Sequence, residues 1–224
     1  MLRHLALVVL AACTGVADEI TLRQTSSTEV TGGAWCSSGA NPEATVEASF
    51  YRVFELADFG IRGGFRAASF TVGVDEAKKS AGEEYVIADL LVHEYTGAVG
   101  GATLDLNAMK LIGTLGLGIR DSPKGTDHRS EFDFTDNVSI DIDERVQVIV
   151  VELYTPRVAA DDRTFRIGLN ALGETGHSYS RCPTVPNLEV PTSYASRGLA
   201  NAHVVLELTG FEIPAFDRDA HSPL

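Results

Sequence analysis

The stretch that indicates the fold runs from Ser49 to Ala77 and reads SFYRVFELADFGIRGGFRAASFTVGVDEA. Two runs in it, Phe50–Leu56 and Phe65–Asp75, are rich in aromatic and β-branched residues, which favour strands. A glycine-rich break separates them, so we interpret the stretch as a β-hairpin. The glycines expected to take positive φ angles in its turn are Gly60, Gly63 and Gly64.

Side chains alternate between the two faces of a strand, so every second residue of these runs is expected to point inward. We predict that Tyr51, Val53, Phe70 and Val72 line a dry space between two stacked sheets. No evident catalytic group lies among these residues, which indicates a stretch that serves packing rather than chemistry.

Similar short apolar runs recur along the chain between clusters of Gly, Ser, Asp and Pro. The further strands that they predict are Ile20–Leu22, Tyr85–Tyr95, Lys110–Ile119, Phe132–Ile142, Val146–Tyr154, Phe165–Leu169 and His203–Leu208. Val146–Tyr154 is almost uninterrupted, as expected for a central strand, and Phe132–Ile142 contains one slip near Asp136 that suggests a bulge. Residues Thr25 to Ala48 are expected to form a loop with at most a short strand.

Eight or more strands without alternating helices predict an all-β fold, a two-sheet antiparallel β-sandwich of the jelly-roll-like kind. We expect this domain over residues 34–210, after an N-terminal extension at 18–33 and before a C-terminal tail at 211–224. The apolar fraction of 44% suffices for one core in a chain of 224 residues.

The formal net charge is −13, from 18 basic and 31 acidic residues. This charge opposes binding to the phosphates of nucleic acid and to anionic lipid. It is typical of an acidic, solvated surface that keeps an exported protein soluble.

The first 17 residues have the pattern of a secretory leader, with a basic start and an apolar run from Leu5 to Ala12. Two processing sites remain open. The sequence before Cys13 resembles the lipobox of bacterial lipoproteins, which predicts lipidation of Cys13, and small residues before Asp18 favour ordinary cleavage there. The expected location is therefore secreted or anchored to the cell surface or outer membrane, with a lipid anchor as the sole membrane contact.

Both processing routes leave Cys36 and Cys182 as the cysteines of the mature chain, and we predict a disulfide between them. The alternative is two unrelated buried thiols. Trp35 is expected to pack on the disulfide rather than to face a ligand.

Several segments, in this order, resemble a jelly-roll-like β-sandwich domain of secreted bacterial proteins. They are SFYRVFELADFGI (49–61), LIGTLGLGI (111–119), VIVVELYTP (148–156), FRIGLNALGETGHSYSRC (165–182) and NAHVVLELTG (201–210). The resemblance implies a module that is often appended to larger surface polypeptides, and it implies no catalytic residues. The polar loop from Asp121 to Glu131 departs from the family pattern.

One loop combines amide, carboxylate, hydroxyl, imidazole and phenol groups, which is the mixture that a sugar site needs. Its candidate ligand-binding residues are Asn170, Glu174, Thr175, His177 and Tyr179. The alternative is purely structural, with Asn170 and Gly173 forming a turn and Tyr179 covering the core near Cys182.

Clusters of carboxylates suggest calcium as a cofactor, because calcium prefers oxygen ligands from loops. The candidate metal ligands are Asp141 and Asp143 with Glu144, then Asp161 and Asp162, then Asp121 with Asp127. None of these clusters fits the EF-hand pattern, and solvated turn residues are the alternative.

These observations leave three classes of function. The first is an exported non-catalytic module for cell-surface adhesion, matrix structure or carbohydrate binding, with a glycan or a surface protein as partner. The second is an extracellular carbohydrate hydrolase in which Glu152 and Glu207 meet as acid and nucleophile. The third is self-assembly, in which Glu19–Glu29 completes the sheet of a neighbouring subunit.

Overall fold

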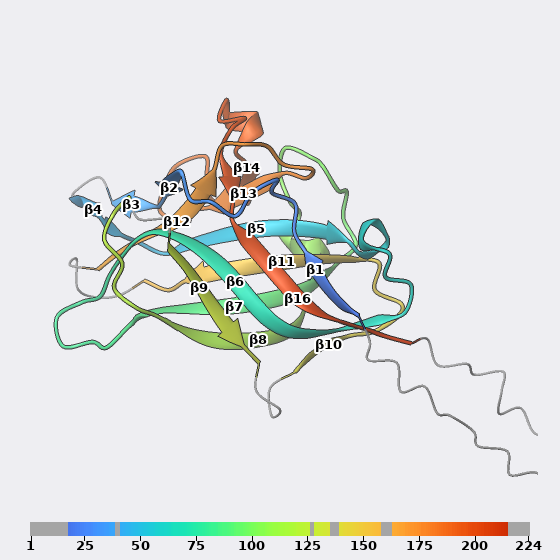
Figure 1. The fold of residues 1–224 in the computed structure, drawn as a ribbon. Helices are drawn as coiled ribbons and strands as arrows, with labels where there is room; N and C mark the ends of the chain where they lie inside the picture. Colours follow the sequence, from blue (N-terminus) through green and yellow to red (C-terminus); the bar gives the residue numbers. More distant parts are fainter. Residues whose placement is uncertain (1–17, 39–40, 126–127, 135–138, 158–162, 215–224) are drawn as a thin grey trace, which may run out of the picture.

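A computed structural model describes residues 18–38, 41–125, 128–134, 139–157 and 163–214. Within these ranges the chain forms two antiparallel sheets packed face to face (Figure 1). The leader with Cys13, and also Asp127, Asp161 and Asp162, lie outside the described residues. The two packed antiparallel sheets confirm the predicted all-β sandwich.

The larger sheet has eight strands in the described part of the chain. They are β1 (Glu19–Leu22), β2 (Gly32–Ala34), β6 (Gly64–Lys78), β9 (His128–Asp133), β10 (Ile140–Ile142), β12 (Thr164–Asn170), β15 (His203–Val204) and β16 (Leu206–Ile213). The second sheet has six strands. They are β5 (Ala48–Glu55), β7 (Val86–Tyr95), β8 (Met109–Ile119), β11 (Val148–Thr155), β13 (Ser178–Arg181) and β14 (Thr192–Ser193).

A small ribbon and three short 3-10 helices complete the described elements. They are β3 (Ser37–Ser38), β4 (Asn41–Thr45), η1 (Leu56–Phe59), η2 (Leu106–Ala108) and η3 (Ala195–Arg197). None of the helices in the described ranges has the length and apolar character needed to cross a membrane.

The strand order is that of a jelly roll, with further strands added at its edges. In one sheet β12 pairs with β2 and β6, and β6 pairs with β9 and β10; in the other the order is β5-β11-β7-β8. From β5 to β12 the chain passes repeatedly from one sheet to the other, which is how two Greek keys close a jelly roll. The strands β13 and β14 extend the second sheet beyond β5.

The expected hairpin between β5 and β6 is wrong, because these strands belong to different sheets. Both edges of β5 are already occupied, by β11 and by β13. After β5 the chain turns through η1 and continues into the other sheet. Of the three glycines expected at positive φ, only Gly60 has it, at 78°, where it ends η1.

The main core lies between the sheets, where Phe70 and Val72 are fully buried as expected. The inward placement of Tyr51 and Val53 is wrong: Phe50 and Phe54 point into this core instead. Tyr51 and Val53 belong to a second apolar cluster on the outer face of the six-stranded sheet, together with Tyr95, Leu104, Val150 and Tyr179. The segment between β7 and β8 contributes Leu104 to this cluster, so β5 is covered on both faces and alternation alone does not identify its inner side.

Other strands follow the expectations with local corrections. The strand β11 lies between β5 and β7 and is central, as predicted. The single strand expected at Phe132–Ile142 is divided into β9 and β10, which pair in succession with β6. Residues 25–48 contain β2, β3 and β4, more strand than expected, because β2 pairs with β12 and β4 with β3.

Both ends of the expected domain extend further than residues 34–210. The strand β1 pairs with β16 in the same chain, from Glu19 opposite Phe211 to Leu22 opposite Leu208. The strand β16 itself continues to Ile213, three residues past Gly210. Because β1 completes the sheet of its own subunit, this pairing counts against the addition of Glu19–Glu29 to a neighbouring subunit.

The predicted disulfide between Cys36 and Cys182 is present, with the two Cα atoms 5.7 Å apart. Cys36 follows β2 in the larger sheet and Cys182 follows β13 in the smaller one, so the bond connects the two layers. Trp35 is 37% exposed and its ring lies against the guanidinium of Arg166, 3.7 Å from the centroid, rather than in the core. This contact is a cation–π stack on the outer side of the sheet.

Candidate functional site

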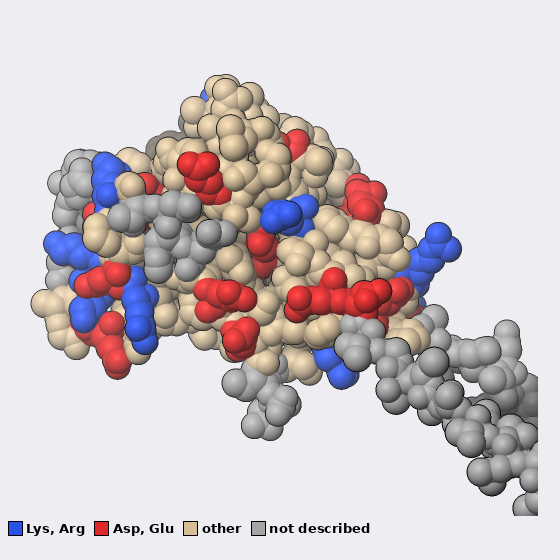
Figure 2. Space-filling model, in the orientation of Figure 1, with Lys and Arg blue, Asp and Glu red and all other residues tan. Residues whose placement is uncertain are grey.

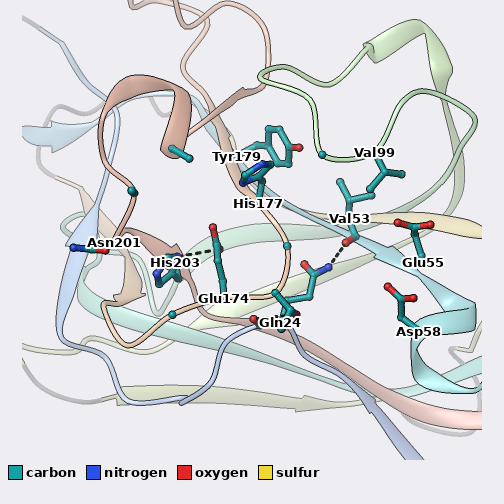
Figure 3. A pocket seen from close by; sticks show the side chains of 16 residues that line it. Gln24, Val53, Glu55, Asp58, Val99, Glu174, His177, Tyr179, Asn201 and His203 are labelled. Carbon is teal, nitrogen blue, oxygen red and sulfur yellow. Dashed lines mark hydrogen bonds and ion pairs between the residues drawn. The ribbon is translucent and has the colours of Figure 1, made fainter.

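A pocket of about 670 Å³ lies beside the end of β5, where the β12–β13 loop meets the segment before β15 (Figure 3). This volume falls in the range of small-molecule sites, about 300–1,000 Å³. The lining includes four of the five residues expected to bind a ligand: Glu174, Thr175, His177 and Tyr179. The other polar and charged residues of the lining are Gln24, Glu55, Asp58, Asn201 and His203.

The carboxylate of Glu174 is anchored through one of its oxygens. Its Oε2 accepts hydrogen bonds from Arg52 Nη1 at 2.6 Å and from Ser178 Oγ at 2.9 Å. His203 Nδ1 lies 3.1 Å from the same oxygen. Oε1 has no partner among the described residues, so the carboxylate is held in one orientation with one oxygen left to accept a hydrogen bond from a ligand.

Arg52 is a fully buried cation behind the pocket wall. Its Nε and Nη2 donate to the carbonyl of Val204 at 2.9 and 2.7 Å, and Nη1 also donates to the carbonyl of Gly176 at 2.9 Å. Burial lowers the pKa of Arg52, and the negative charge of Glu174 opposes that decrease. The arginine thus joins β5, the β12–β13 loop and β15 into one rigid unit.

Tyr179 is buried in the wall of the pocket, so its ring does not present a flat face to a ligand. The residue is 1% exposed, and its hydroxyl donates a hydrogen bond to the carbonyl of Gly101 at 3.0 Å. Burial raises the pKa of Tyr179 to about 12, so the hydroxyl remains a donor at neutral pH. His177 packs edge-on against this ring, with centroids 6.2 Å apart, and is only partly buried.

Gln24 reaches the pocket from the segment after β1. Its Nε2 donates to the carbonyl of Val53 at 2.6 Å, as drawn in Figure 3. Its Oε1 is buried and has no hydrogen-bond partner among the described residues. No pattern in the sequence pointed to Gln24, because it is more than a hundred residues away from the β12–β13 loop that contains the predicted site residues.

Asn170 is the candidate residue that the structure removes from the pocket. It is fully buried; its Nδ2 donates to the carbonyl of Glu29 and its Oδ1 accepts from the backbone N–H of Leu172, both at 2.7 Å. Gly173 has a φ of 121°, a conformation that favours glycine. The structural alternative is therefore correct for the turn, while Tyr179 covers the outer cluster rather than the core that contains Cys182.

Two of the carboxylates expected to hold calcium, Asp141 and Asp143, are paired with arginines. Asp141 accepts two hydrogen bonds from Arg66, both at 2.8 Å, and Asp143 accepts from Arg145 at 2.8 and 3.1 Å. Asp121 Oδ1 accepts a hydrogen bond from the backbone N–H of Lys79 at 2.9 Å. Among the described residues no group of three or more His, Cys, Asp or Glu side chains is arranged to hold a metal ion.

The carboxylates expected to act together in a hydrolase lie in different sheets. Glu152 is on β11 and Glu207 is on β16, and the residues on either side of each point into the core. Both carboxylates therefore point outward, away from one another, and cannot form the catalytic pair. Glu207 instead forms an ion pair with Arg23, in which Oε1 of the glutamate lies 3.5 Å from Nη1 of the arginine.

Glu152 belongs to a nearly buried polar group on the outer face of the six-stranded sheet. His93 Nε2 lies 2.9 Å from Glu152 Oε2, and each side chain is 11% exposed. Tyr51 is directly opposite Glu152 on the adjacent strand, and burial together with the negative charge of Glu152 raises its pKa well above the usual range. These three residues are not part of the lining of the pocket beside β5.

No family model, no curated protein and no solved structure matches this chain. The resemblance to secreted bacterial sandwich domains therefore stays a prediction, and the site is interpreted from its own geometry.

Proposed function

We propose that the protein is an exported, non-catalytic module that binds carbohydrate in the pocket beside β5. The observation that supports this proposal best is the anchored carboxylate of Glu174, which presents one fixed acceptor in a pocket of suitable volume. Sugar hydroxyls are recognised by such pre-oriented acceptors, since little side-chain entropy is lost on binding.

Further groups around the pocket fit the same type of ligand. His177 and Asn201 offer donors and acceptors that make no hydrogen bond within the described structure, and Val53 and Val99 supply apolar contacts. Jelly rolls are also a fold of lectins, although a fold by itself does not define an activity.

The test is a glycan array on the purified protein, followed by calorimetric titration with the glycan that binds best. We expect His177→Ala and Asn201→Ala each to weaken binding about five- to tenfold, since each removes about 1 kcal/mol of polar contact. Asn107→Ala is the matched control, because Asn107 is an exposed asparagine on η2 outside the pocket lining. An array without any retained glycan, or titrations unchanged by both pocket variants, would contradict the proposal.

Calcium remains a proposed cofactor through Asp161 and Asp162, which lie outside the described residues. Repeating the titration in calcium and in EDTA tests it. Equal affinity in both buffers would mean that the sugar site does not depend on calcium.

A further inference from the structure

We infer that the ligand of this pocket carries a protonated primary amine, as an amino sugar with an unsubstituted amino group does. The inference rests on the proposed carbohydrate function and concerns the charge that the pocket selects. Two observations support the inference: the identity of the charged groups that line the pocket, and the accessibility of each group to a ligand.

The described residues that line the pocket include carboxylates but no lysine or arginine. Glu55, Asp58 and Glu174 all line it, and Glu55 and Asp58 are exposed and form no hydrogen bond or ion pair with the described residues. Figure 3 places Glu55 and Asp58 at the end of the pocket away from His203 and Asn201. Their charges therefore act on whatever occupies that end.

Arg52, the cation behind the wall, cannot reach a ligand. Its side chain is fully buried, and its nitrogens already donate to Glu174 and to the carbonyls of Gly176 and Val204. It balances the charge of Glu174 but leaves Glu55 and Asp58 unbalanced. An anionic sugar would thus meet two carboxylates without a cation to offset them.

The lining also contains hydrogen-bond acceptors that have no partner among the described residues, which favours a ligand that donates hydrogen bonds. Glu174 Oε1 has no partner in the described structure, and neither has the buried Gln24 Oε1. An ammonium group has three donors and no acceptor, so it suits this arrangement better than a hydroxyl or a carboxylate does.

The acidic character is not confined to the pocket. Figure 2 shows Asp and Glu side chains spread over the outer face of the eight-stranded sheet, with Lys and Arg gathered mainly at one end. Together with the net charge of −13, this field attracts cations and repels anionic glycans before contact. The charge of the pocket and the charge of the surrounding surface therefore favour the same ligands, those that carry a positive charge.

The experiment measures the affinities of D-glucosamine, D-glucose and D-glucuronate by ligand-observed NMR at one pH and low salt. We expect glucosamine to bind about fivefold more tightly than glucose, and glucuronate to bind more weakly than glucose. The preference should shrink in 0.5 M salt, because screening weakens interactions between exposed charges. Equal affinities for glucosamine and glucose would overturn the inference while leaving the proposed function intact, whereas failure of all three sugars would count against both.

Two variants locate the effect. The double variant Glu55→Gln/Asp58→Asn should lower the affinity for glucosamine to that for glucose, with the affinity for glucose unchanged. The matched control is Glu131→Gln/Asp133→Asn, which makes the same charge change at exposed residues of β9 outside the lining. A glucosamine preference that survives the pocket variant, or is lost equally in the control, would overturn the assignment to Glu55 and Asp58.

Ethanolamine separates the amine from the sugar. It carries a primary amine but no ring, so we expect it to bind more weakly than glucosamine. Ethanolamine binding as tightly as glucosamine, with no binding of glucose, would mean that the pocket recognises amines in general and would overturn the assignment to an amino sugar.

Discussion

At Arg52 the protein buries a full positive charge next to a carboxylate that is 12% exposed. Transfer of such a charge from water is costly, and the cost is offset only when the partner and the hydrogen bonds are all in place. Four hydrogen bonds to Glu174, Gly176 and Val204 meet this requirement. The same contacts that hold the fold also orient the acceptor of the pocket.

We therefore expect Glu174→Gln to destabilise the protein. The variant leaves the buried Arg52 without its counter-charge, and breaking a buried pair in this way costs about 3 kcal/mol. Denaturant unfolding followed by tryptophan fluorescence measures the change. Glu55→Gln serves as the control: it removes an exposed carboxylate of the same pocket and should change the free energy of unfolding by less than about 0.5 kcal/mol. Equal stability of the two variants would mean that Arg52 does not need its ion pair.

The role of Glu174 could be anticipated from the sequence only in part. The mixed chemistry of the loop after Leu169 indicated a polar site, and four of its candidate residues do line the pocket. Arg52 was interpreted as part of a strand built for packing, because nothing in its neighbourhood shows that the partner lies 122 residues later. The prediction that Asn170 lies in the binding site was wrong. An asparagine whose buried amide shapes a turn cannot be distinguished by residue type from one that binds a sugar.

At the scale of elements, β16 is attached to the turn after η1 through one carboxylate. Glu212 Oε1 accepts hydrogen bonds from the backbone N–H groups of Arg62 and Gly63, at 2.7 and 2.8 Å. These bonds lower the pKa of Glu212 below its usual value. They join the turn that leads into β6 to the neighbouring strand, in the part of the chain where the hairpin was expected.

This contact predicts a small dependence of stability on pH. Because the pKa of Glu212 is lower in the folded chain than in the unfolded one, the stabilisation is complete at neutral pH and is lost as the pH falls through the folded value. Glu212→Gln should therefore lower the free energy of unfolding at pH 7 by about 1 kcal/mol at most, since the carboxylate is close to solvent.

Urea unfolding of both proteins at several pH values between 7 and 2.5 is the measurement. The two curves should converge at the acidic end. A difference that stays constant over the whole range would show that the charge of Glu212 is not responsible.

The division of β5 and β6 between two sheets illustrates why local patterns identify strands but not their partners. Both strands were recognised from their composition, and their ends were close to correct. A hairpin and a crossover contain the same residue types at their turns, and only the occupation of both edges of β5 by β11 and β13 decides between them.

At the scale of the whole molecule, the disulfide between Cys36 and Cys182 connects the two layers over a separation of 146 residues. Cross-linking such distant residues reduces the entropy of the unfolded chain by an amount equivalent to about 5 kcal/mol in the chain-entropy model. Measured effects are usually smaller. The bond also keeps the β2–β3 segment close to the end of β13.

Replacement of both cysteines, Cys36→Ala/Cys182→Ala, should lower the free energy of unfolding by about 2–5 kcal/mol. Guanidinium unfolding of the oxidised protein and of the double variant gives this difference. Addition of a reductant should destabilise the natural chain and leave the double variant unaffected. A natural chain insensitive to reductant under conditions that reduce the bond would contradict a stabilising role.

The sequence by itself determined the class of fold, most of the longer strands and the Cys36–Cys182 pair, because alternation and strand propensity are local and because these two cysteines are the ones that follow the predicted leader. Only the tertiary structure decided which strands are neighbours, which face of β5 meets the core, and that Gln24, Arg52, Glu174 and His203 meet at one pocket. Those outcomes depend on contacts between residues far apart along the chain. Such contacts form, and contribute to stability, only when the two sheets are packed against each other.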